Sequence, residues 1–248
     1  MVSFLRGRYA ARFAETPDDL AGAQALRALC FRGTDRGDDA DAFDALCRHV
    51  LVEEVKTGRV VCCFRLLPLT GGAEIGRSYA AQYYELSGLK SFPGPMVEMG
   101  RFCIHPDCRD PDILRVAWGA MTRYVDATGV ELLFGCSSFK GTEAGQYMDS
   151  FALLKDRHLA PKRFLPRIKA PNVFRFAQKL RRRTPDATRA MLGMPPLLRT
   201  YLVMGGWVSD HAVVDRDLNT LHVFTAIEIG AIPPARQRLL RAAAGQGA

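Results

Sequence analysis

The part of the sequence that most constrains the fold runs from residue 95 to residue 139. It begins with "PMVEMGRFCIHP" (95–106), whose β-branched and aromatic residues before a proline predict a strand. An amphipathic pattern between Pro111 and Gly129 predicts a helix, and "VELLFGCSSF" (130–139) predicts another strand. A strand, a helix and a strand in this order indicate two parallel strands joined by a crossover helix, as in α/β domains.

The segments before this unit add antiparallel strands. "GRYAARFA" (7–14) predicts a first strand, and residues 16–33 predict a helix with Thr16 as its N-cap. The runs 49–55 and 59–69 flank "KTG", which is a hairpin signal. We therefore expect an α/β fold with a mixed central sheet and flanking helices.

The last third of the sequence continues the sheet. "LLRTYLVMGGWV" (197–208) and "LHVFTAIEIGAI" (221–232) are both strand-like, and a short helix follows them. No internal repeat or clear linker interrupts the chain. We therefore expect residues 1–248 to form one domain, with residues 194–230 as a strand-rich C-terminal extension.

Composition limits the class of protein. The chain has 248 residues, of which 48% are hydrophobic and 24% charged, so a packed core is expected. No apolar run is long enough to span a membrane, and arginines interrupt the N-terminal stretch, so a secretory signal is not expected. The seven cysteines include no CxxC pair, which predicts reduced thiols, no metal site and a cytoplasmic location. The net charge of +8 points to an anionic partner.

The strand 95–106 carries an acid and a base in an apolar run. Glu98 and Arg101 are three residues apart, so a regular strand would place them on opposite faces. Gly100 lies between them, and a glycine inside a strand often marks a β-bulge. We expect a bulge at Gly100, which would let both charges approach one cleft and splay the sheet.

Five motifs follow one another along the chain: "LRALCF" (26–31), "DAFD" (41–44), "CFRLLP" (63–68), "VEMGRFCIHP" (97–106) and the stretch 194–224. Together they resemble the GNAT acyltransferase fold, and within it two branches that use acyl-carrier protein. These branches are the acyl-homoserine lactone synthases and the ornithine-lipid N-acyltransferases. The lactone synthases usually have a tryptophan between the Phe and the acidic pair, which is absent here. The stretch 194–224, with Pro-x-Leu-Leu-x-x-Tyr-Leu, two glycines and an aspartate, is similar to the lipid branch.

The resemblance implies an N-acyltransferase. A 3-hydroxyacyl chain would pass from acyl-carrier protein to the α-amino group of ornithine or a similar amino acid, giving a lyso-aminolipid. Attack would be direct, without a covalent acyl-enzyme, and no cofactor would be bound permanently; the acyl-carrier protein, with its phosphopantetheine thioester, is the co-substrate.

This chemistry assigns roles to the motif residues. Glu98 is the candidate base, and backbone N–H groups around Met99–Arg101, with Gly100 at the bulge, are candidate donors to the oxyanion. The candidate substrate-binding residues are Asp41 and Asp44 for a cationic group, Arg27 or Arg65 for a carboxylate, and Phe31 and Phe102 for the acyl pocket.

Each role has a structural alternative. Glu98 is also explained by a structural ion pair with Arg65 or Arg101. Arg27 and Asp44 are also explained by an ion pair that fixes the first helix to the acidic loop. Phe31 and Phe102 are also explained as core residues. A thioester intermediate on Cys103 is the minor mechanism, because an apolar strand raises the pKa of a thiol.

The place where the acetyl-CoA branch has a glycine-rich loop reads "PDCRDPDILRVAWGA" here. Arg109 and free N–H groups near Ile113 are the candidates to hold one phosphate at a helix N-terminus. Asp110 and Asp112 argue against a dense pyrophosphate site. This favours phosphopantetheine on a carrier protein over free coenzyme A.

Residues 155–183 form a basic segment with eleven Lys and Arg and a single acid. An acidic carrier protein could dock on it, or it could lie on an anionic membrane as a basic amphipathic helix at the inner membrane face. Nucleic acid is the less favoured partner, because no recognised motif accompanies the charge. The residues proposed to contact carrier or membrane are Lys179, Arg181, Arg182 and Arg183.

Two other functions stay open at this stage. One is an acyl-homoserine lactone synthase, which would use S-adenosylmethionine. The other is a non-enzymatic basic module that binds membranes or nucleic acid. The retained Glu-x-x-Arg strand and acidic loop argue against the second.

Overall fold

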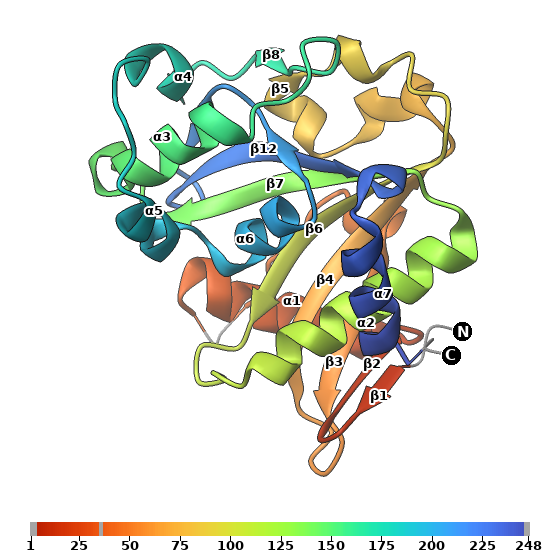
Figure 1. The fold of residues 1–248 in the computed structure, drawn as a ribbon. Helices are drawn as coiled ribbons and strands as arrows, with labels where there is room; N and C mark the ends of the chain where they lie inside the picture. The colour runs from red at the N-terminus through yellow and green to blue at the C-terminus, as the bar shows by residue number, and fades with distance from the viewer. Residues whose placement is uncertain (1–3, 35–36, 246–248) are drawn as a thin grey trace. The chain divides into compact units, whose positions relative to one another are not determined.

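The computed structural model of the chain describes residues 4–34 and 37–245 (Figure 1). The contacts within the chain divide it into two compact units. Unit 1 comprises Met1–Pro68, Met99–Val130 and Pro233–Ala248, and unit 2 comprises Leu69–Glu98 and Glu131–Ile232. The boundary cuts the predicted central strand between Glu98 and Met99. The expectation of a single domain over residues 1–248 stays a prediction.

Unit 1 contains an antiparallel sheet. Its strands are β1 (Phe4–Arg6), β2 (Tyr9–Phe13), β3 (Arg48–Glu54) and β4 (Val60–Leu69), in that order, with the second half of β6 (Met96–Ile104) beside β4. β3 and β4 pair antiparallel, from Arg48 opposite Leu66 to Glu53 opposite Val60, which confirms the predicted hairpin.

The helices of unit 1 begin and end at the residues that the sequence indicated. Helix α1 (Pro17–Arg27) opens with a capping box, in which Thr16 accepts from the Asp19 amide and Asp19 accepts from the Thr16 amide. A π-helical turn, Ala28–Arg32, continues α1 and ends at Gly33, which has φ 69°. Helix α2 (Pro111–Thr128) ends at Gly129, and α7 (Pro234–Ala243) closes the unit.

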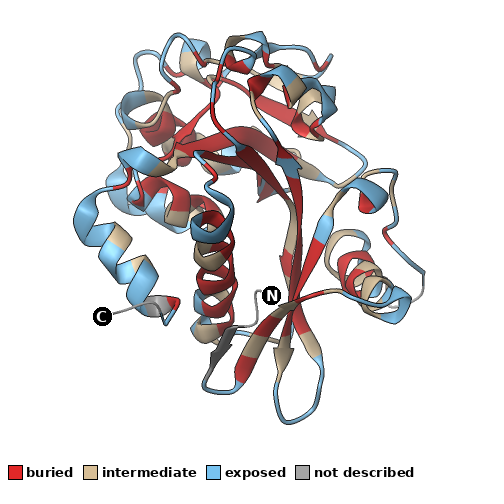
Figure 2. Ribbon diagram, turned by 90° about the vertical axis from the view of Figure 1, so that its right-hand side faces the viewer, coloured by how far each residue is buried: buried red, intermediate tan, exposed pale blue. Residues whose placement is uncertain are grey.

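Apolar side chains hold the helices on the strands of unit 1. Ala23 and Leu26 of α1 pack with Leu51, Cys63 and Cys103 of the strands. Helix α2 contacts β1, β2 and β3, and Tyr124 meets Phe13 edge-on with ring centroids 6.2 Å apart. Figure 2 shows the strands largely in the colour of buried residues, as expected for a core built on them.

Unit 2 contains a second group of strands. The first half of β6 pairs parallel with β7 (Leu132–Lys140) over three residue pairs, ending with Glu98 opposite Phe134. β7 pairs antiparallel with β12 (Thr220–Glu228) over nine residue pairs. β12 also pairs with β10 (Trp207–Val208) and β11 (Ala212–Asp215), and β11 pairs with β9 (Val173–Phe174); β5 (Tyr84–Glu85) and β8 (Arg167–Ile168) form a separate pair.

The parallel pairing of β6 with β7 confirms the predicted strand–helix–strand unit, because α2 connects these two strands in the chain. Four helices belong to unit 2: α3 (Met148–Arg157), α4 (Phe176–Lys179), α5 (Ala187–Gly193) and α6 (Pro196–Val203). Unit 2 also contains short 3₁₀ turns at Gly72–Arg77, Ala80–Gln82, Ser87–Leu89, Ala144–Tyr147 and Ile229–Ala231. A further 3₁₀ turn, Asp44–Leu46, belongs to unit 1. One core of unit 2 joins Phe139 and Val223 of the sheet to Phe151, Leu198 and Leu202 of the helices.

Two expectations about unit 2 are wrong. Residues 197–203 are the helix α6 and not a strand, because Leu198 and Leu202 recur at helical spacing and both enter the core. The basic segment 155–183 is not one amphipathic helix. It contains the end of α3, two short strands and α4.

Among the described residues, no helix is both long enough and apolar enough to cross a bilayer.

Candidate active site

A buried network of arginines and aspartates lies in unit 1. The arginines come from α1 and its π-helical continuation (Arg27, Arg32), from β4 (Arg65) and from β6 (Arg101), and the aspartates from the acidic loop (Asp39, Asp41, Asp44). We call these seven residues the Arg–Asp network. It brings together five of the sequence-predicted site residues, which are Arg27, Asp41, Asp44, Arg65 and Arg101.

Asp44 is the centre of the network. Its Oδ1 accepts from Nη1 of Arg27 at 2.7 Å and from Nη1 of Arg65 at 2.6 Å, and its Oδ2 accepts from the Gln24 amide at 2.9 Å. The Arg27 side chain is 1% exposed, so this is a fully desolvated ion pair. A buried carboxylate with two guanidinium partners fixes α1 to the acidic loop and to β4.

Asp39 and Asp41 complete the network. Asp39 lies 3.2 Å from Nε of Arg27 and 2.9 Å from Nε of Arg101. Asp41 accepts from Nη2 of Arg65 at 2.8 Å and from Nη2 of Arg101 at 3.2 Å. The Asp41 side chain is 23% exposed, the most open of the three carboxylates.

Burial alone would raise the pKa of Asp44, but the hydrogen bonds from Arg27 and Gln24 outweigh it and hold the pKa below its usual value. Asp41 shows the same balance, in which Arg65 outweighs burial and lowers the pKa of the carboxyl group. Asp41 and Asp44 are therefore ionised at neutral pH. The network has four guanidinium groups and three carboxyl groups, a formal excess of one positive charge, which suits an anionic partner.

The irregular backbone of β6 lies at Arg101 and not at Gly100. Arg101 has φ 52°, a left-handed conformation that interrupts the alternation of the strand. Gly100 has no positive φ, and a Cβ built on it would meet the Arg65 side chain at 3.6 Å, an ordinary contact. The sequence predicted an irregular backbone at this point but placed it one residue early, because glycine is the usual residue for it.

The two predicted aromatic residues lie beside charged members of the network. The Arg101 guanidinium is 5.8 Å from the centroid of the Phe31 ring, within range of a cation–π contact. Phe102 stacks on Phe64 with centroids 5.7 Å apart. Both rings are partly exposed, so each has a face that is available to a substrate.

Glu98, the last residue of unit 2 before the boundary, is held by main-chain amides. Its Oε2 accepts from the Tyr79 amide and its Oε1 from the Ala80 amide, both at 2.7 Å. These amides open the 3₁₀ turn Ala80–Gln82. The Glu98 side chain is 4% exposed. The two amides belong to an ordered turn, so they fix the orientation of the carboxylate.

Tyr201 of α6 lies within electrostatic range of Glu98. Burial raises the pKa of Tyr201, and the charge of Glu98 raises it further. This places the Tyr of the Pro-x-Leu-Leu-x-x-Tyr-Leu motif near the candidate base. Its hydroxyl is therefore neutral at physiological pH, and it can donate a hydrogen bond.

The predicted phosphate site at the start of α2 is wrong. The Asp112 amide donates to the Asp110 side chain at 2.9 Å, and the Ile113 amide donates to the Asp110 carbonyl at 3.2 Å. Ile113 itself is fully buried, and Arg109 is exposed. The N-cap carboxylate already occupies the position that an anion would need.

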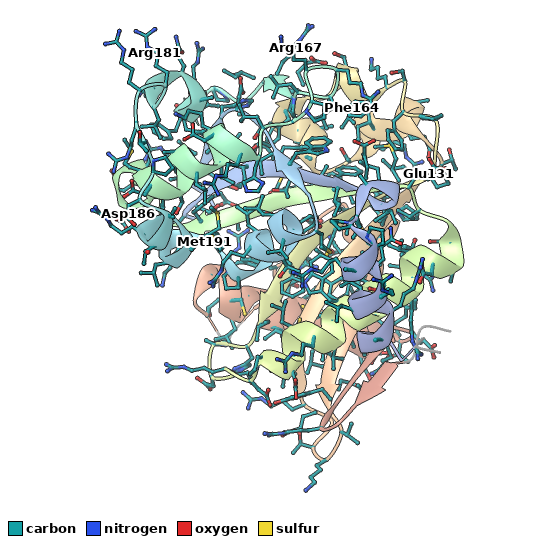
Figure 3. The ribbon with its side chains drawn as sticks, in the orientation of Figure 1. Glu131, Phe164, Arg167, Arg181, Asp186 and Met191 are labelled. Atoms are coloured by element: carbon teal, nitrogen blue, oxygen red, sulfur yellow. The ribbon has the colours of Figure 1, made fainter. Side chains whose placement is uncertain are left out.

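The basic segment presents its charges outward and its aromatic residues inward. Phe174 and Phe176 pack on Phe151 with centroids 5.4 and 5.2 Å apart, so these two rings serve the core of unit 2. Arg167 and Arg181 extend away from the ribbon in Figure 3. The charged residues of the segment therefore form an exposed basic surface.

The predicted basic residues differ in whether another side chain contacts them. Arg183 pairs with Asp149 at 2.9 Å, and Lys179 lies 5.4 Å from the Phe174 ring. Arg181 and Arg182 are exposed, with no carboxylate partner among the described residues. These two are available to an acidic partner.

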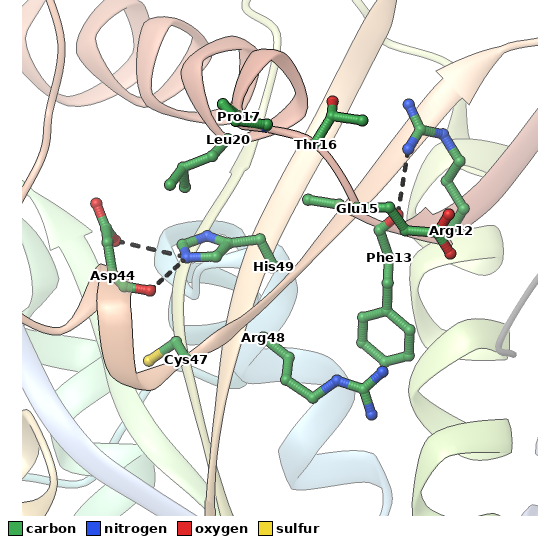
Figure 4. A pocket seen from close by; sticks show the side chains of 11 residues that line it. Arg12, Phe13, Glu15, Thr16, Pro17, Leu20, Asp44, Cys47, Arg48 and His49 are labelled. Atoms are coloured by element: carbon green, nitrogen blue, oxygen red, sulfur yellow. Dashed lines mark hydrogen bonds and ion pairs between the residues drawn. The ribbon is translucent and has the colours of Figure 1, made fainter.

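The sequence did not indicate two features near the network. Asp39 pairs with three arginines, but it stands in a run of acidic residues in which nothing marks it out. An open cavity of about 940 Å³ lies in unit 1 beside Asp44, with His49 and Cys47 in its wall (Figure 4). Nε2 of His49 lies 3.1 Å from the Asp44 carbonyl oxygen, and burial lowers the pKa of His49, so its ring is neutral.

Residues 27–119 match the model of the acetyltransferase (GNAT) domain. The chain is 36% identical over 199 residues to an L-ornithine N(alpha)-acyltransferase of Rhodobacter capsulatus, covering 78% of this chain and 76% of that protein. The chain belongs to the L-ornithine N(alpha)-acyltransferase family. A protein of the same name from Rhizobium meliloti is 27% identical over 239 residues, covering 89% of this chain and 80% of the relative.

A solved structure agrees with this fold. An N-acyl amino acid synthase from uncultured soil microbes matches with a TM-score of 0.50 and 9% identity, covering 90% of this chain and 92% of that one. The predicted GNAT-like fold is confirmed, and the chain is an acyltransferase.

Proposed function

We propose that this acyltransferase transfers a 3-hydroxyacyl chain from acyl-carrier protein to the α-amino group of ornithine, giving a lyso-aminolipid. The observation that carries the proposal is the 36% identity to a protein named L-ornithine N(alpha)-acyltransferase. The buried carboxylate of Glu98 and the Arg–Asp network support it, because the reaction needs a base and a charged amino-acid site.

In the proposed reaction, the neutral α-amine attacks the thioester carbonyl carbon. A C–N bond forms, the C–S bond breaks, and the carrier protein leaves as its thiol. Glu98 takes the proton of the amine, directly or through a water, and this proton then passes to the departing sulfur. Main-chain amides near Gly100 and Arg101 stabilise the oxyanion in this proposal.

The network is proposed to hold the amino acid. Its excess positive charge favours the α-carboxylate, and Arg27 and Arg65 are the candidate donors. Asp41, as the most exposed carboxylate, is the candidate partner of the side-chain ammonium. Phe31 and Phe102 are the candidate walls of the acyl site.

We propose that the carrier protein docks on the exposed basic residues of unit 2. Arg181 and Arg182 are the leading candidates, with Lys179 and Arg183 beside them in the chain. Acidic carriers are steered by such surfaces, and the effect falls with salt.

The test is an acyl-transfer assay with mass spectrometry as the readout. The donors are a 3-hydroxyacyl-carrier protein, the unsubstituted acyl-carrier protein of equal length and the coenzyme A thioester. The acceptors are ornithine, lysine, glutamine and S-adenosylmethionine. The proposal expects the amide of ornithine with the hydroxylated carrier donor as the fastest reaction. A lactone product from S-adenosylmethionine, or no amide from any amino acid, would overturn it.

A further inference from the structure

Three cysteine thiols gather in unit 1 close to the Arg–Asp network. Cys30 lies on the π-helical turn, Cys63 on β4 and Cys103 on β6. The sulfurs of Cys63 and Cys103 are 3.5 Å apart. The sulfur of Cys30 is 3.4 Å from the carbonyl oxygen of Ile104, and Cys30 packs against the cluster that contains the other two.

The three thiols differ in access to solvent. Cys63 and Cys103 are buried, whereas Cys30 is only partly buried. No group of three His, Cys, Asp or Glu side chains within residues 4–34 and 37–245 has an arrangement that could hold a metal ion. A partly exposed thiol packed beside a buried one is instead the arrangement expected of a peroxide-reactive cysteine with its resolving partner.

The hydrogen bonding agrees with this division of roles. A hydrogen bond with Cys103 lowers the pKa of Cys30, and the same bond raises the pKa of Cys103. The thiolate is the reactive form of cysteine, so Cys30 is the better nucleophile and Cys103 keeps its proton.

We propose that Cys30 and Cys103 form a reversible disulfide when the protein meets a hydroperoxide. The Cys30 thiol first takes the terminal oxygen of the hydroperoxide, which leaves as its alcohol, or as water when the oxidant is hydrogen peroxide. The resulting sulfenic acid then reacts with the Cys103 thiol, so that an S–S bond forms, the S–O bond breaks and water leaves. The two thiols lose two electrons, and the hydroperoxide gains them.

The disulfide would connect two segments of the network. Cys30 follows Arg27 by three residues, and Cys103 follows Arg101 by two. Bonded sulfurs are about 2 Å apart, closer than two thiols in van der Waals contact, so oxidation draws the π-helical turn and β6 towards each other. This movement disturbs the 2.7 Å hydrogen bond of Arg27 and the 2.9 Å ion pair of Arg101. We therefore expect oxidation to lower acyl transfer, a consequence that rests on the proposed function.

The first test maps the bond and needs no activity. The reduced, full-length protein is treated with hydrogen peroxide, the free thiols are alkylated, and the peptides are identified by mass spectrometry. The expected result is a Cys30–Cys103 cross-linked peptide that dithiothreitol removes. Sulfinic or sulfonic acid at Cys30 without a cross-link, or Cys63–Cys103 as the main linked pair, would overturn the proposal.

The second test uses matched variants. C30S should abolish the cross-link, whereas C108S, which removes another partly buried thiol of unit 1, should keep it. If ornithine is acylated, peroxide should lower the turnover of the C108S variant at least fivefold, reversibly, and leave C30S unaffected. A mapped cross-link with unchanged turnover would overturn the coupling to the network. If the protein acylates no amino acid, the proposed function is wrong, and the mapped cross-link still decides the disulfide proposal.

Discussion

The buried charges of the two units are stabilised in different ways. In unit 1, the charges of the Arg–Asp network satisfy one another through side chains that come from α1, the acidic loop, β4 and β6. In unit 2, the main-chain amides of Tyr79 and Ala80 bind Glu98. Main-chain donors are already ordered, so they hold the carboxylate in one orientation without further side chains. In the proposed function, the network maintains the fold and holds the amino acid, and Glu98 takes the proton of the amine.

The largest expected effect on stability comes from removing the centre of the network. D44A leaves Arg27 and Arg65 buried without their shared carboxylate oxygen. We expect the free energy of unfolding to fall by about 3–5 kcal/mol, as measured by urea denaturation. D107A, which removes a 79% exposed aspartate of unit 1, is the matched control and should change it by less than about 0.5 kcal/mol. Equal effects of the two substitutions would contradict a structural role for the network.

The two units should also differ in their response to acid. Burial lowers the pKa of His222 in unit 2 to about 4, against about 6.5 when unfolded. The folded state disfavours the protonated ring, so this stability is present above pH 6.5 and is lost as pH falls towards 4, by about 3 kcal/mol. The lowered pKa of Asp44 in unit 1 affects the free energy of unfolding only at lower pH. Stability from a depressed carboxyl pKa is lost below about pH 4, where the carboxylate of the unfolded chain takes up a proton.

Urea unfolding between pH 7 and pH 4.5 tests this difference. H222F lacks the titrating ring, so its free energy of unfolding should be less sensitive to pH over this range. Tyr84 donates to the carbonyl of residue 222 at 2.8 Å, a bond that H222F keeps, so we expect the variant to fold. An unchanged pH slope in H222F would assign the acid sensitivity elsewhere. Hydrogen exchange should show protection lost in unit 2 before unit 1 as the pH falls.

A smaller effect is expected at the basic surface of unit 2. Reversing Arg181 and Arg182 together to glutamate should raise the KM for the acyl-carrier protein about tenfold at low salt, with kcat little changed. Reversal of the exposed Arg238 on α7 of unit 1 is the matched control. If both variants behave alike, the response reflects net charge and not a docking surface.

The smallest effect is expected at Gly100. The backbone of Gly100 has no positive φ, and a Cβ would meet its nearest neighbour, Arg65, at 3.6 Å. G100A should therefore fold normally and change the free energy of unfolding by less than about 1 kcal/mol. A loss of several kcal/mol would show that the irregularity of β6 depends on this glycine as well as on Arg101.

The sequence predicted those parts of the fold that short-range physics determines. Thr16 caps α1, Gly129 ends α2, and the hairpin signal between β3 and β4 places both strands, because caps and turns depend on neighbouring residues. Helix α6 was predicted as a strand, because its aromatic and β-branched residues favour strands. The packing of its apolar face against the core outweighs this local preference and makes the segment helical.

The residues of the candidate site were predictable where they belong to a sequence motif. They were not predictable where residues outside the motifs come into contact only in the folded chain. Arg27 and Asp44 form the ion pair that the structural alternative for these two residues predicted, and Arg65 joins the same carboxylate. Asp39 joins them only because the acidic loop folds back on α1, and the left-handed φ of Arg101 has no signal in an arginine. Contacts of this kind follow from tertiary structure.

The most direct test of the central claim is the single-turnover rate of E98Q with saturating 3-hydroxyacyl-carrier protein and ornithine. The carboxamide can accept from one of the two main-chain amides but cannot take a proton from the amine. We predict a folded protein whose rate is about 100-fold or more below that of the unsubstituted enzyme. A folded E98Q variant with a rate within about threefold of it would contradict the account and make Glu98 a structural residue.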